Sequence, residues 1–453
     1  MEESYTNSKI KRTKLAFDSL SIYRNLLENK ALNKLYELFD YLNQEKIDLS
    51  YFTNLYNDFF LKLCYSSNKS LKDLVIELIL FDENPFSLKL QSKNKEAYIL
   101  QKTVEKDLNN LQIISSIASS MIKTYALEIF NNIEFSYETI KNLPDWETEY
   151  KDLSENEQYP NHYKSMRKYL YDCNRWNECI KYLIEYYEKY GCGIFSRYRA
   201  FVWENSGYER NFKPIYEFDT ISLSDFIGYE LERSKIIENT LQFLKGFSAN
   251  NVLLYGDRGT GKSSTVKALL NEYHNQGLRI IEIPKSYLTD FPLILRAVRN
   301  KPQKFIIFID DLSFKEDDEN YTALKALLEG GLENKPNNVL IYATSNRRHL
   351  IKETFNDRNG LSSSNTNEEI HAADTIQEKL SLADRFGITV VFSAPDKNQY
   401  LKIVNGIATK RNISINKEEL CKEALKWELS YNGRSPRTAR QFIDWLEGHK
   451  NLY

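Results

Sequence analysis

The pattern of apolar and polar residues divides the chain into two halves. From about residue 14 to residue 199, apolar side chains recur at spacings of three and four with few glycines, as in SLSIYRNLLENKALNKLYELFDYL. This spacing is typical of amphipathic helices that bury one face. The pattern therefore predicts an all-helical N-terminal domain.

The second half has a different pattern. Short apolar runs alternate with helix-length segments: NVLLY, RIIEI, KFIIFI, NVLIYATS and ITVVFS, at residues 251–255, 279–283, 304–309, 338–345 and 388–393. Apolar runs without polar alternation are typical of parallel strands whose two faces are both covered. We therefore expect an α/β domain built on a parallel sheet.

A polar segment separates the two patterns. Residues 203–220 read WENSGYERNFKPIYEFDT and show no periodicity, and they contain a glycine and a proline. Such composition is typical of a connection between domains. We predict the all-helical N-terminal domain over residues 1–210 and a linker over residues 211–220.

The first apolar run of the second half leads into a glycine-rich turn and then a helical pattern. The turn fits GxxxxGKS/T in the strand-to-helix context that a phosphate-binding loop requires. Glycines let successive N–H groups approach a phosphate at the positive end of the helix. Lys262 would neutralise β- and γ-phosphate oxygens and Ser263 would bind Mg²⁺, which predicts an ATP and Mg²⁺ site. Its expected residues are Gly256, Asp257, Arg258, Gly259, Thr260, Gly261, Lys262, Ser263 and Ser264.

Two later strands supply polar groups for the same chemistry. Asp310 and Asp311 end the run KFIIFI, where Asp310 can hold Mg²⁺ through water and Asp311 can orient or deprotonate the attacking water. The alternative is a strand whose two carboxylates cap a helix. Asn346 ends NVLIYATS, and there it can reach the γ-phosphate or the attacking water. The alternative for Asn346 is an ordinary turn residue.

These motifs, in this order, resemble an AAA+ ATPase module over about residues 221–453. SLSDFIGYELERSKIIENTLQFLKG resembles the entry segment of that module, EKLSLADRFGI the arginine-finger segment, and NGRSPRTARQFIDWLEG the sensor of the helical lid. The resemblance implies an AAA+ P-loop NTPase core over residues 221–394 and a small helical lid over residues 395–453. The site residues that it implies are Phe226, Ile227, Gly228 and Tyr229 at the adenine, Arg385 as the finger, and Arg437, or else Arg440, as the lid sensor.

The segments NVLLYGDRGTGKSSTVKALL, IDDLSF, YATSNRRHLI, LSLADRFG and ARQFIDWL together resemble a bacterial family of AAA+ ATPases with a helical N-terminal half, known chiefly as a conserved domain of unknown function. The resemblance implies fold and nucleotide chemistry and leaves the cellular task open. One position departs from the wider AAA+ pattern, because Asp311 stands where a glutamate is usual. Hydrolysis is then either slow or assisted by a base elsewhere.

Composition and charge bear on the binding partners and the cellular location of the protein. The 61 basic and 63 acidic residues give a net charge of -2, which does not indicate a nucleic-acid-binding surface, although the run Arg347-Arg348-His349 leaves local contact open. Five cysteines without CxxC pairs indicate a reducing cytosol. The most apolar run, LVIELILF, is too short for a bilayer span. We expect a cytoplasmic protein with no membrane span.

The expected function is binding and hydrolysis of Mg·ATP to drive conformational change or remodelling of a partner. We expect a homo-oligomer in which Arg385 reaches a neighbour's nucleotide, and a protein partner on the helical N-terminal domain. Three alternatives stay open. They are an ATP-dependent switch without turnover, which Asp311 favours, a DNA-associated ATPase resembling helicase loaders, and a kinase, in which the sensor and finger motifs would have no purpose.

Overall fold

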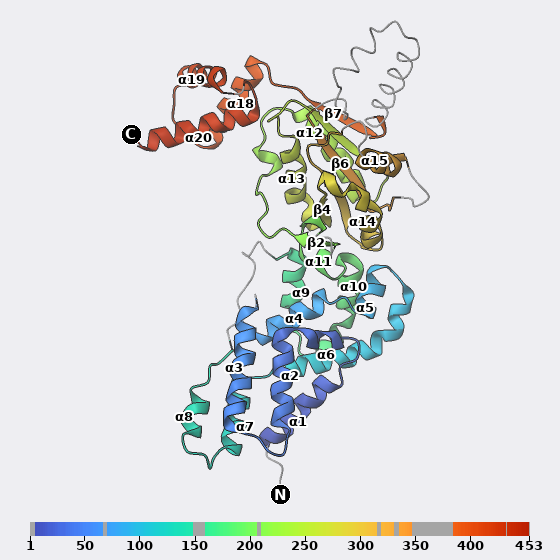
Figure 1. The fold of residues 1–453 in the computed structure, drawn as a ribbon, viewed down its shortest axis with the longest axis vertical. Helices are drawn as coiled ribbons and strands as arrows, with labels where there is room; N and C mark the ends of the chain where they lie inside the picture. The colour runs from blue at the N-terminus through green and yellow to red at the C-terminus, as the bar shows by residue number, and fades with distance from the viewer. Residues whose placement is uncertain are drawn as a thin grey trace. The chain divides into compact units, whose positions relative to one another are not determined.

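The computed structural model describes residues 5–66, 70–147, 159–205, 210–314, 319–329, 335–346, 384–431 and 433–452. The chain forms two compact units, Met1–Arg197 and Tyr198–Tyr453 (Figure 1). Each unit has its own buried apolar core. Among the described residues, no helix combines the length and the apolar character needed to cross a bilayer.

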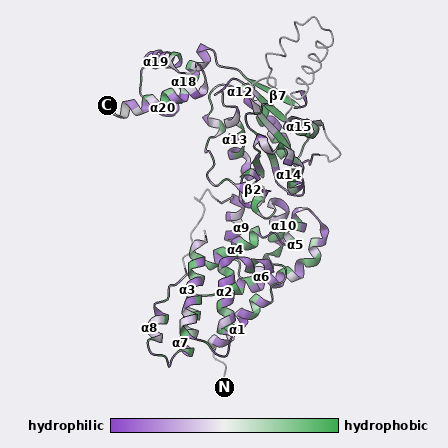
Figure 2. Ribbon diagram, viewed as in Figure 1, coloured by the Kyte–Doolittle hydropathy of each residue, from purple (hydrophilic) through white to green (hydrophobic). Residues whose placement is uncertain are grey.

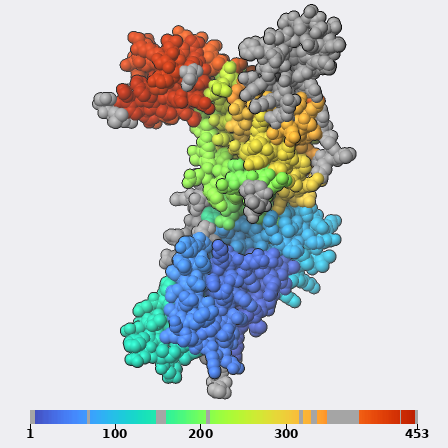
Figure 3. All heavy atoms as spheres, viewed as in Figure 1, coloured from blue at the N-terminus to red at the C-terminus, as the bar shows by residue number. Residues whose placement is uncertain are grey.

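The first unit is entirely helical in its described part, as the spacing of its apolar residues predicts. Hydrophobic and hydrophilic residues are interspersed along its helices (Figure 2), and its first hundred or so residues, blue in the space-filling view, lie next to one another (Figure 3). The helices are α1 (Tyr5–Asp18), α2 (Lys30–Leu42), α3 (Leu49–Tyr65), α4 (Leu71–Phe81), α5 (Pro85–Gln91), α6 (Gln101–Ser115), α7 (Ser119–Ile129), α8 (Ser136–Lys141), α9 (Asn161–Asp172), α10 (Ile180–Tyr190) and α11 (Ile194–Arg197), with 3₁₀ turns at Arg24–Glu28, Lys95–Leu100 and Trp176–Cys179.

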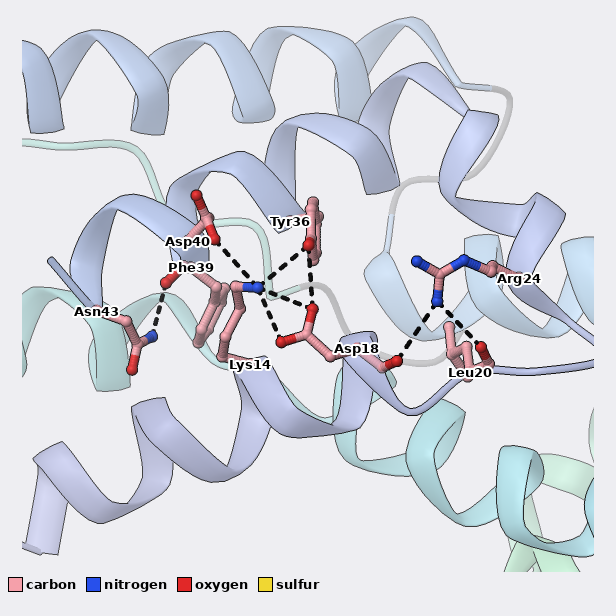
Figure 4. A network of polar contacts seen from close by, with 8 residues as sticks. All are labelled: Lys14, Asp18, Leu20, Arg24, Tyr36, Phe39, Asp40 and Asn43. Carbon is pink, nitrogen blue, oxygen red and sulfur yellow. Dashed lines mark hydrogen bonds and ion pairs between the residues drawn. The ribbon is translucent and has the colours of Figure 1, made fainter.

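Polar contacts fix the packing of α1 on α2. The Lys14 ammonium lies 2.8 Å from Asp18 Oδ1 on its own helix and 3.1 Å from Asp40 Oδ1 on α2 (Figure 4). It also donates to the Tyr36 hydroxyl at 3.1 Å, which itself donates to Asp18 at 3.0 Å. One lysine thus joins the two helices through three residues, and this network adds to the packing of the Phe17 ring on Phe39.

The second unit contains a seven-stranded sheet with the order β2-β1-β4-β5-β6-β3-β7. Every neighbouring pair is parallel except β1 with β2. The strands are β1 (Ala200–Asn205), β2 (Arg210–Pro214), β3 (Val252–Gly256), β4 (Leu278–Glu282), β5 (Lys304–Ile309), β6 (Val339–Ser345) and β7 (Ile388–Phe392). The five apolar runs are therefore the five strands β3 to β7, and the predicted parallel sheet is confirmed.

The remaining elements of the second unit are helical. Buried residues of α13 and α12 share one core cluster with residues of the sheet, so these two helices cover one of its faces. The elements are α12 (Glu230–Leu244), α13 (Lys262–Tyr273), α14 (Phe291–Val298), α15 (Glu319–Glu329), α18 (Lys397–Lys410), α19 (Lys417–Ser430) and α20 (Pro436–Leu452), with 3₁₀ turns at Leu223–Asp225, His274–Gln276 and Lys285–Asp290.

The predicted domain boundary is wrong by more than a dozen residues. Residues expected to end the helical domain and to start the linker form the hairpin β1–β2, and β1 pairs with β4 at the edge of the sheet. Trp203 is buried, packs on Phe212 at 4.9 Å and donates to Asp290 at 2.9 Å. The hairpin has a polar sequence because β2 is an exposed edge strand, and such polarity along the chain resembles that of a linker.

The last three helices, α18 to α20, surround a small core of their own. Tyr400 and Ile403 of α18 pack there with Phe442 and Ile443 of α20. Asp396 caps α18, accepting a hydrogen bond from the backbone N–H of Gln399 at 2.8 Å. We call these helices the lid, since they lie within the range 395–453 in which the sequence predicts one.

Candidate nucleotide-binding site

The site lies at the carboxyl edge of the sheet, where β3 runs between β6 and β7. Since β3, β5 and β6 are parallel, the residues that follow each of them meet at this edge. In α/β sheets, ligands bind outside the carboxyl ends of strands where the direction of the strand order changes. The glycine-rich loop, residues 256–261, leaves β3 at that point and leads directly into α13.

Three glycines shape this loop. Gly256, Gly259 and Gly261 have φ angles of 129°, 74° and 96°, which side chains with a Cβ rarely adopt. A Cβ on Gly256 would collide with the carbonyl group of Phe392, and one on Gly259 would lie 2.9 Å from Ser435 Oγ. The loop is therefore a cradle of exposed backbone that only glycine can form, as a phosphate-binding loop requires.

The Lys262 side chain folds back over the loop. Its ammonium donates to the carbonyl oxygens of Gly256 at 2.9 Å and Asp257 at 2.7 Å, and to Asn346 Oδ1 at 3.2 Å. Burial lowers the pKa of Lys262, and nearby carboxylates oppose that shift. The three oxygens around the ammonium occupy positions that phosphate oxygens can take over, because a charged donor bonds more strongly to an anion than to a neutral carbonyl.

A hydroxyl group and a carboxylate lie together beside the loop. Ser263 Oγ donates to Asp310 Oδ1 at 2.6 Å, and Thr344 Oγ1 donates to the same oxygen at 2.5 Å. The Thr344 hydroxyl also accepts the backbone N–H of Asp311 at 3.0 Å. Hydroxyl and carboxylate oxygens are the ligands that Mg²⁺ prefers. The pair Ser263 and Asp310 therefore fits the magnesium ion that a phosphate loop uses.

Asn346 connects Asp311, the second of the two acids after β5, to Lys262. Its Nδ2 donates to Asp311 Oδ1 at 2.6 Å while its Oδ1 accepts from Lys262. Asp311 itself has a φ of 50°, an uncommon left-handed conformation for a residue with a side chain. An ordinary turn asparagine would not bridge these two charged groups, so the geometry favours the functional interpretation of Asn346.

The residues expected at the adenine gather beside the loop. The Phe226 ring lies 3.6 Å from the position of a Cβ on Gly261, and Ile227 packs closely on Gly406 of α18. The Tyr229 ring lies 5.5 Å from that of Phe392, at the end of β7. Gly228 has a φ of 79° and lies between Ile227 and Tyr229 in the same segment. This segment therefore contacts the loop, β7 and the lid, and its contact with adenine stays a prediction.

The lid reaches the loop through Arg437. Its backbone N–H donates to the carbonyl oxygen of Gly259 at 3.1 Å, and its charge opposes the protonation of Lys262. Arg440 lies further along the same helix, and the side chains of Arg437 and Arg440 are both exposed. The backbone contact with Gly259 places Arg437 next to the loop, which favours Arg437 over Arg440 as the lid sensor.

The remaining residues predicted at the loop differ in how far they are buried. The Thr260 side chain is buried and donates to the Asp257 carbonyl oxygen at 2.8 Å. Arg258 is exposed, and Ser264 lies half-buried in the first turn of α13.

Arg385 does not meet the site of its own chain. It precedes β7, and because β7 runs parallel to β3, Arg385 lies at the opposite edge of the sheet from the glycine-rich loop. Its assignment as a finger for a neighbouring chain stays a prediction. The basic run Arg347-Arg348-His349 lies outside the described residues.

Sequence reasoning overlooked two groups at this edge. Thr344, two residues before Asn346, has a hydroxyl that joins Asp310 to the backbone of Asp311. Glu282 ends β4, next to β5, and burial raises its pKa. A glutamate within the apolar run RIIEI is the signal that could have identified this second group.

Fold and site together define an AAA+ type P-loop nucleotide-binding module: a parallel sheet, a glycine-rich loop before a helix, two acids after a neighbouring strand, and a helical lid. The chain belongs to the family described as protein of unknown function DUF815, whose model matches residues 196–450.

Individual relatives are more distant. A Methanocaldococcus jannaschii protein named as a homolog of a 26S proteasome regulatory subunit is 27% identical over 258 residues, covering 50% of this chain and 68% of that protein. A mutant of Thermotoga maritima RuvB aligns with a TM-score of 0.34 and 19% identity, covering 51% of this chain and 66% of that one. The RuvB Holliday junction branch migration motor of Thermotoga maritima aligns with a TM-score of 0.30 and 15% identity. The alignment covers 50% of this chain and 72% of that one. This chain thus spans just under two thirds of the first RuvB chain.

Proposed function

We propose that this protein binds Mg·ATP at the glycine-rich loop and hydrolyses it to drive a conformational change that acts on a partner. One observation carries the proposal: Lys262, Asn346 and Asp311 form a continuous chain of hydrogen bonds beside the pair Ser263 and Asp310. This set contains a phosphate-binding cation, a group that positions water, an acid that can take its proton and two ligands for a metal ion.

Each residue then has a defined task. Lys262 exchanges its carbonyl partners for phosphate oxygens. Ser263 and Asp310 would hold Mg²⁺, which supplies charge neutralisation at the phosphates when bound. Asp311 orients the attacking water and accepts its proton, and the hydrogen bond from Asn346 sets the direction of its carboxylate. Arg437 approaches from the lid and contacts the γ-phosphate.

The partner and the assembly are also part of the proposal. A protein partner would bind the first unit, which exposes single apolar side chains, among them Tyr65, Ile99 and Phe135. A homo-oligomer would supply Arg385 to the nucleotide of the next chain. The guanidinium fork suits the charge that develops on a transferring phosphoryl group.

Binding and turnover are tested separately. Lys262→Ala should lose most ATP affinity in equilibrium dialysis because it removes the cation at the phosphates, whereas Lys267→Ala, on the same helix α13, should bind like the parent. Asp311→Asn should bind ATP but release phosphate on the order of a hundredfold more slowly, the usual scale for a general base. Unchanged ATP binding by folded Lys262→Ala would contradict the nucleotide site.

A second function is favoured by one observation. Asp311 is one methylene shorter than the usual glutamate, and its carboxylate is held by Asn346 at 2.6 Å. A chain that binds ATP tightly without turning it over would act as a switch. Phosphate release from the parent no faster than from Asp311→Asn, with tight ATP binding by both, would establish the switch in place of the ATPase.

A further inference from the structure

Two hydrogen bonds tie the glycine-rich loop to the lid. Asp257 Oδ2 accepts the backbone N–H of Ala394 at 2.6 Å, at the point where the chain leaves β7 for α18. Gly259 accepts the N–H of Arg437 at 3.1 Å, at the start of α20. The lid is thus attached to the loop both where it begins and at its last helix.

Asp257 is the loop residue with the most connections across this junction. Its N–H donates to the Phe392 carbonyl oxygen at 2.9 Å, and its own carbonyl oxygen accepts from Lys262 at 2.7 Å. Its carboxylate then reaches past the end of β7 to the N–H of Ala394. One residue therefore touches the phosphate-binding lysine, the end of β7 and the entry to the lid.

The chemistry of the side chain suits this task. A carboxylate that accepts a backbone N–H makes a charge-assisted hydrogen bond, which is roughly twice as strong as a neutral one. Among the carboxylates near Lys262, Asp257 makes the largest opposing contribution to the pKa shift that burial causes. Asp257, together with Asp310 and Asp311, thus partly offsets the effect of burial on the ammonium.

We propose that Asp257 is a positioning residue that transmits occupancy of the phosphate loop to the lid. We call its hydrogen bond to the Ala394 N–H the Asp257 latch. The inference rests on the proposed function, since it assumes that ATP is the occupant. When Lys262 turns to phosphate oxygens, the Asp257 carbonyl loses its cation and keeps the Thr260 hydroxyl as a donor, so the forces on this peptide change and the peptide shifts. That movement acts on Ala394 and on the start of α18.

A further contact between lid and core gives a matched control. The Lys410 ammonium, at the end of α18, donates to the carbonyl oxygen of Ser224, which is not part of the glycine-rich loop. Lys410→Ala removes a lid contact without touching the latch. Asp257→Asn keeps an oxygen that can accept the N–H of Ala394, whereas Asp257→Ala leaves none.

Amide hydrogen exchange measures the latch directly. Without nucleotide, Asp257→Ala should speed exchange in peptides that contain the Ala394 amide by roughly tenfold to a hundredfold, the scale expected for a hydrogen bond to a charged group. Asp257→Asn should give an intermediate rate, and Lys410→Ala the parental rate at Ala394. At Mg·ATP concentrations that saturate each variant, as checked by equilibrium dialysis, exchange in α18 and α20 should change in the parent and in Lys410→Ala but not in Asp257→Ala.

The outcomes are distinguishable. Parental exchange at Ala394 in folded Asp257→Ala overturns the latch, and so does a lid response to ATP in Asp257→Ala that equals the parental one. Failure of the parent to bind ATP overturns the proposed function and the nucleotide step of this inference, while the comparison without nucleotide still decides whether Asp257 holds the entry to the lid. Faster exchange across the whole second unit of Asp257→Ala would indicate unfolding. In that case the exchange rate at Ala394 in Asp257→Asn, compared with the parental rate, decides whether the latch exists.

Discussion

Asn346→Asp tests the geometry of the nucleotide site most sharply. The substitution replaces an amide with a carboxylate of almost the same shape, so packing at the end of β6 is preserved. In the parent, the amide donates to Asp311 at 2.6 Å and accepts from Lys262 at 3.2 Å. The new carboxylate keeps its attraction to the lysine, loses the donor and faces a second carboxylate.

The expected magnitudes follow from these distances. At about 3 Å in a water-like dielectric, a charge pair contributes ~1.4 kcal/mol, and this limit suits the pair with the exposed Asp311. Lys262 is buried, so its attraction to the new carboxylate is at least as large as the repulsion from Asp311, and without nucleotide the free energy of unfolding should not fall. With ATP bound, Lys262 is shared with the phosphates, so the repulsion of the new carboxylate from Asp311 and from the phosphates dominates. ATP affinity should then fall by roughly tenfold to a hundredfold.

The assay compares Asn346→Asp with Asn346→Ala by calorimetric titration of Mg·ATP, together with denaturation in urea. Asn346→Ala loses the hydrogen bonds without adding charge, so its ATP affinity should stay near the parental value while its turnover falls about tenfold. The defect of Asn346→Asp should weaken as salt is added, because salt screens exposed charges. Equal ATP affinity of the two variants would refute the placement of Asn346 beside the phosphates.

Three further predictions concern other parts of the second unit. Arg385→Ala should bind ATP but hydrolyse it roughly a thousandfold more slowly. Mixing it with Lys262→Ala should restore part of the activity, because one chain then supplies an intact loop and the other an intact finger. A parent whose specific activity is independent of protein concentration would contradict this. Gly256→Ala should lower the free energy of unfolding by about 2–4 kcal/mol, as its Cβ would collide with a strand carbonyl, whereas Gly246→Ala, with a φ of 87° and nothing within 4 Å, should cost only about 1 kcal/mol. Burial lowers the pKa of Lys335 to about 8, so between pH 8 and pH 10.5 the unfolded chain binds more protons than the folded one. The free energy of unfolding should therefore rise over this range by at most about 3 kcal/mol. Lys335→Met should remove that rise in urea denaturation, and the same pH profile for parent and variant would contradict the prediction.

The strands that the sequence predicted are those buried on both faces. Apolar runs such as residues 304–309 have no other stable location than the middle of a covered sheet, and β5 is almost wholly buried. The hairpin β1–β2 was missed because an edge strand needs few apolar residues. Its stability comes from pairing with β4 and from the contacts of Trp203, which depend on residues about 80 positions away in the chain, such as Asp290 at a separation of 87.

The sequence by itself determined the glycine-rich loop. Its conformation depends on glycines that accept positive φ angles and on the lysine and serine that directly follow them, and all of these are neighbours along the chain. Only the tertiary structure decided what surrounds the loop. Asp310 reaches Ser263 across 47 positions, and Asn346 reaches Lys262 across 84. These contacts exist because β5 and β6 lie next to one another and β6 lies next to β3. That strand order is set by the burial of the whole sheet, which no local segment specifies.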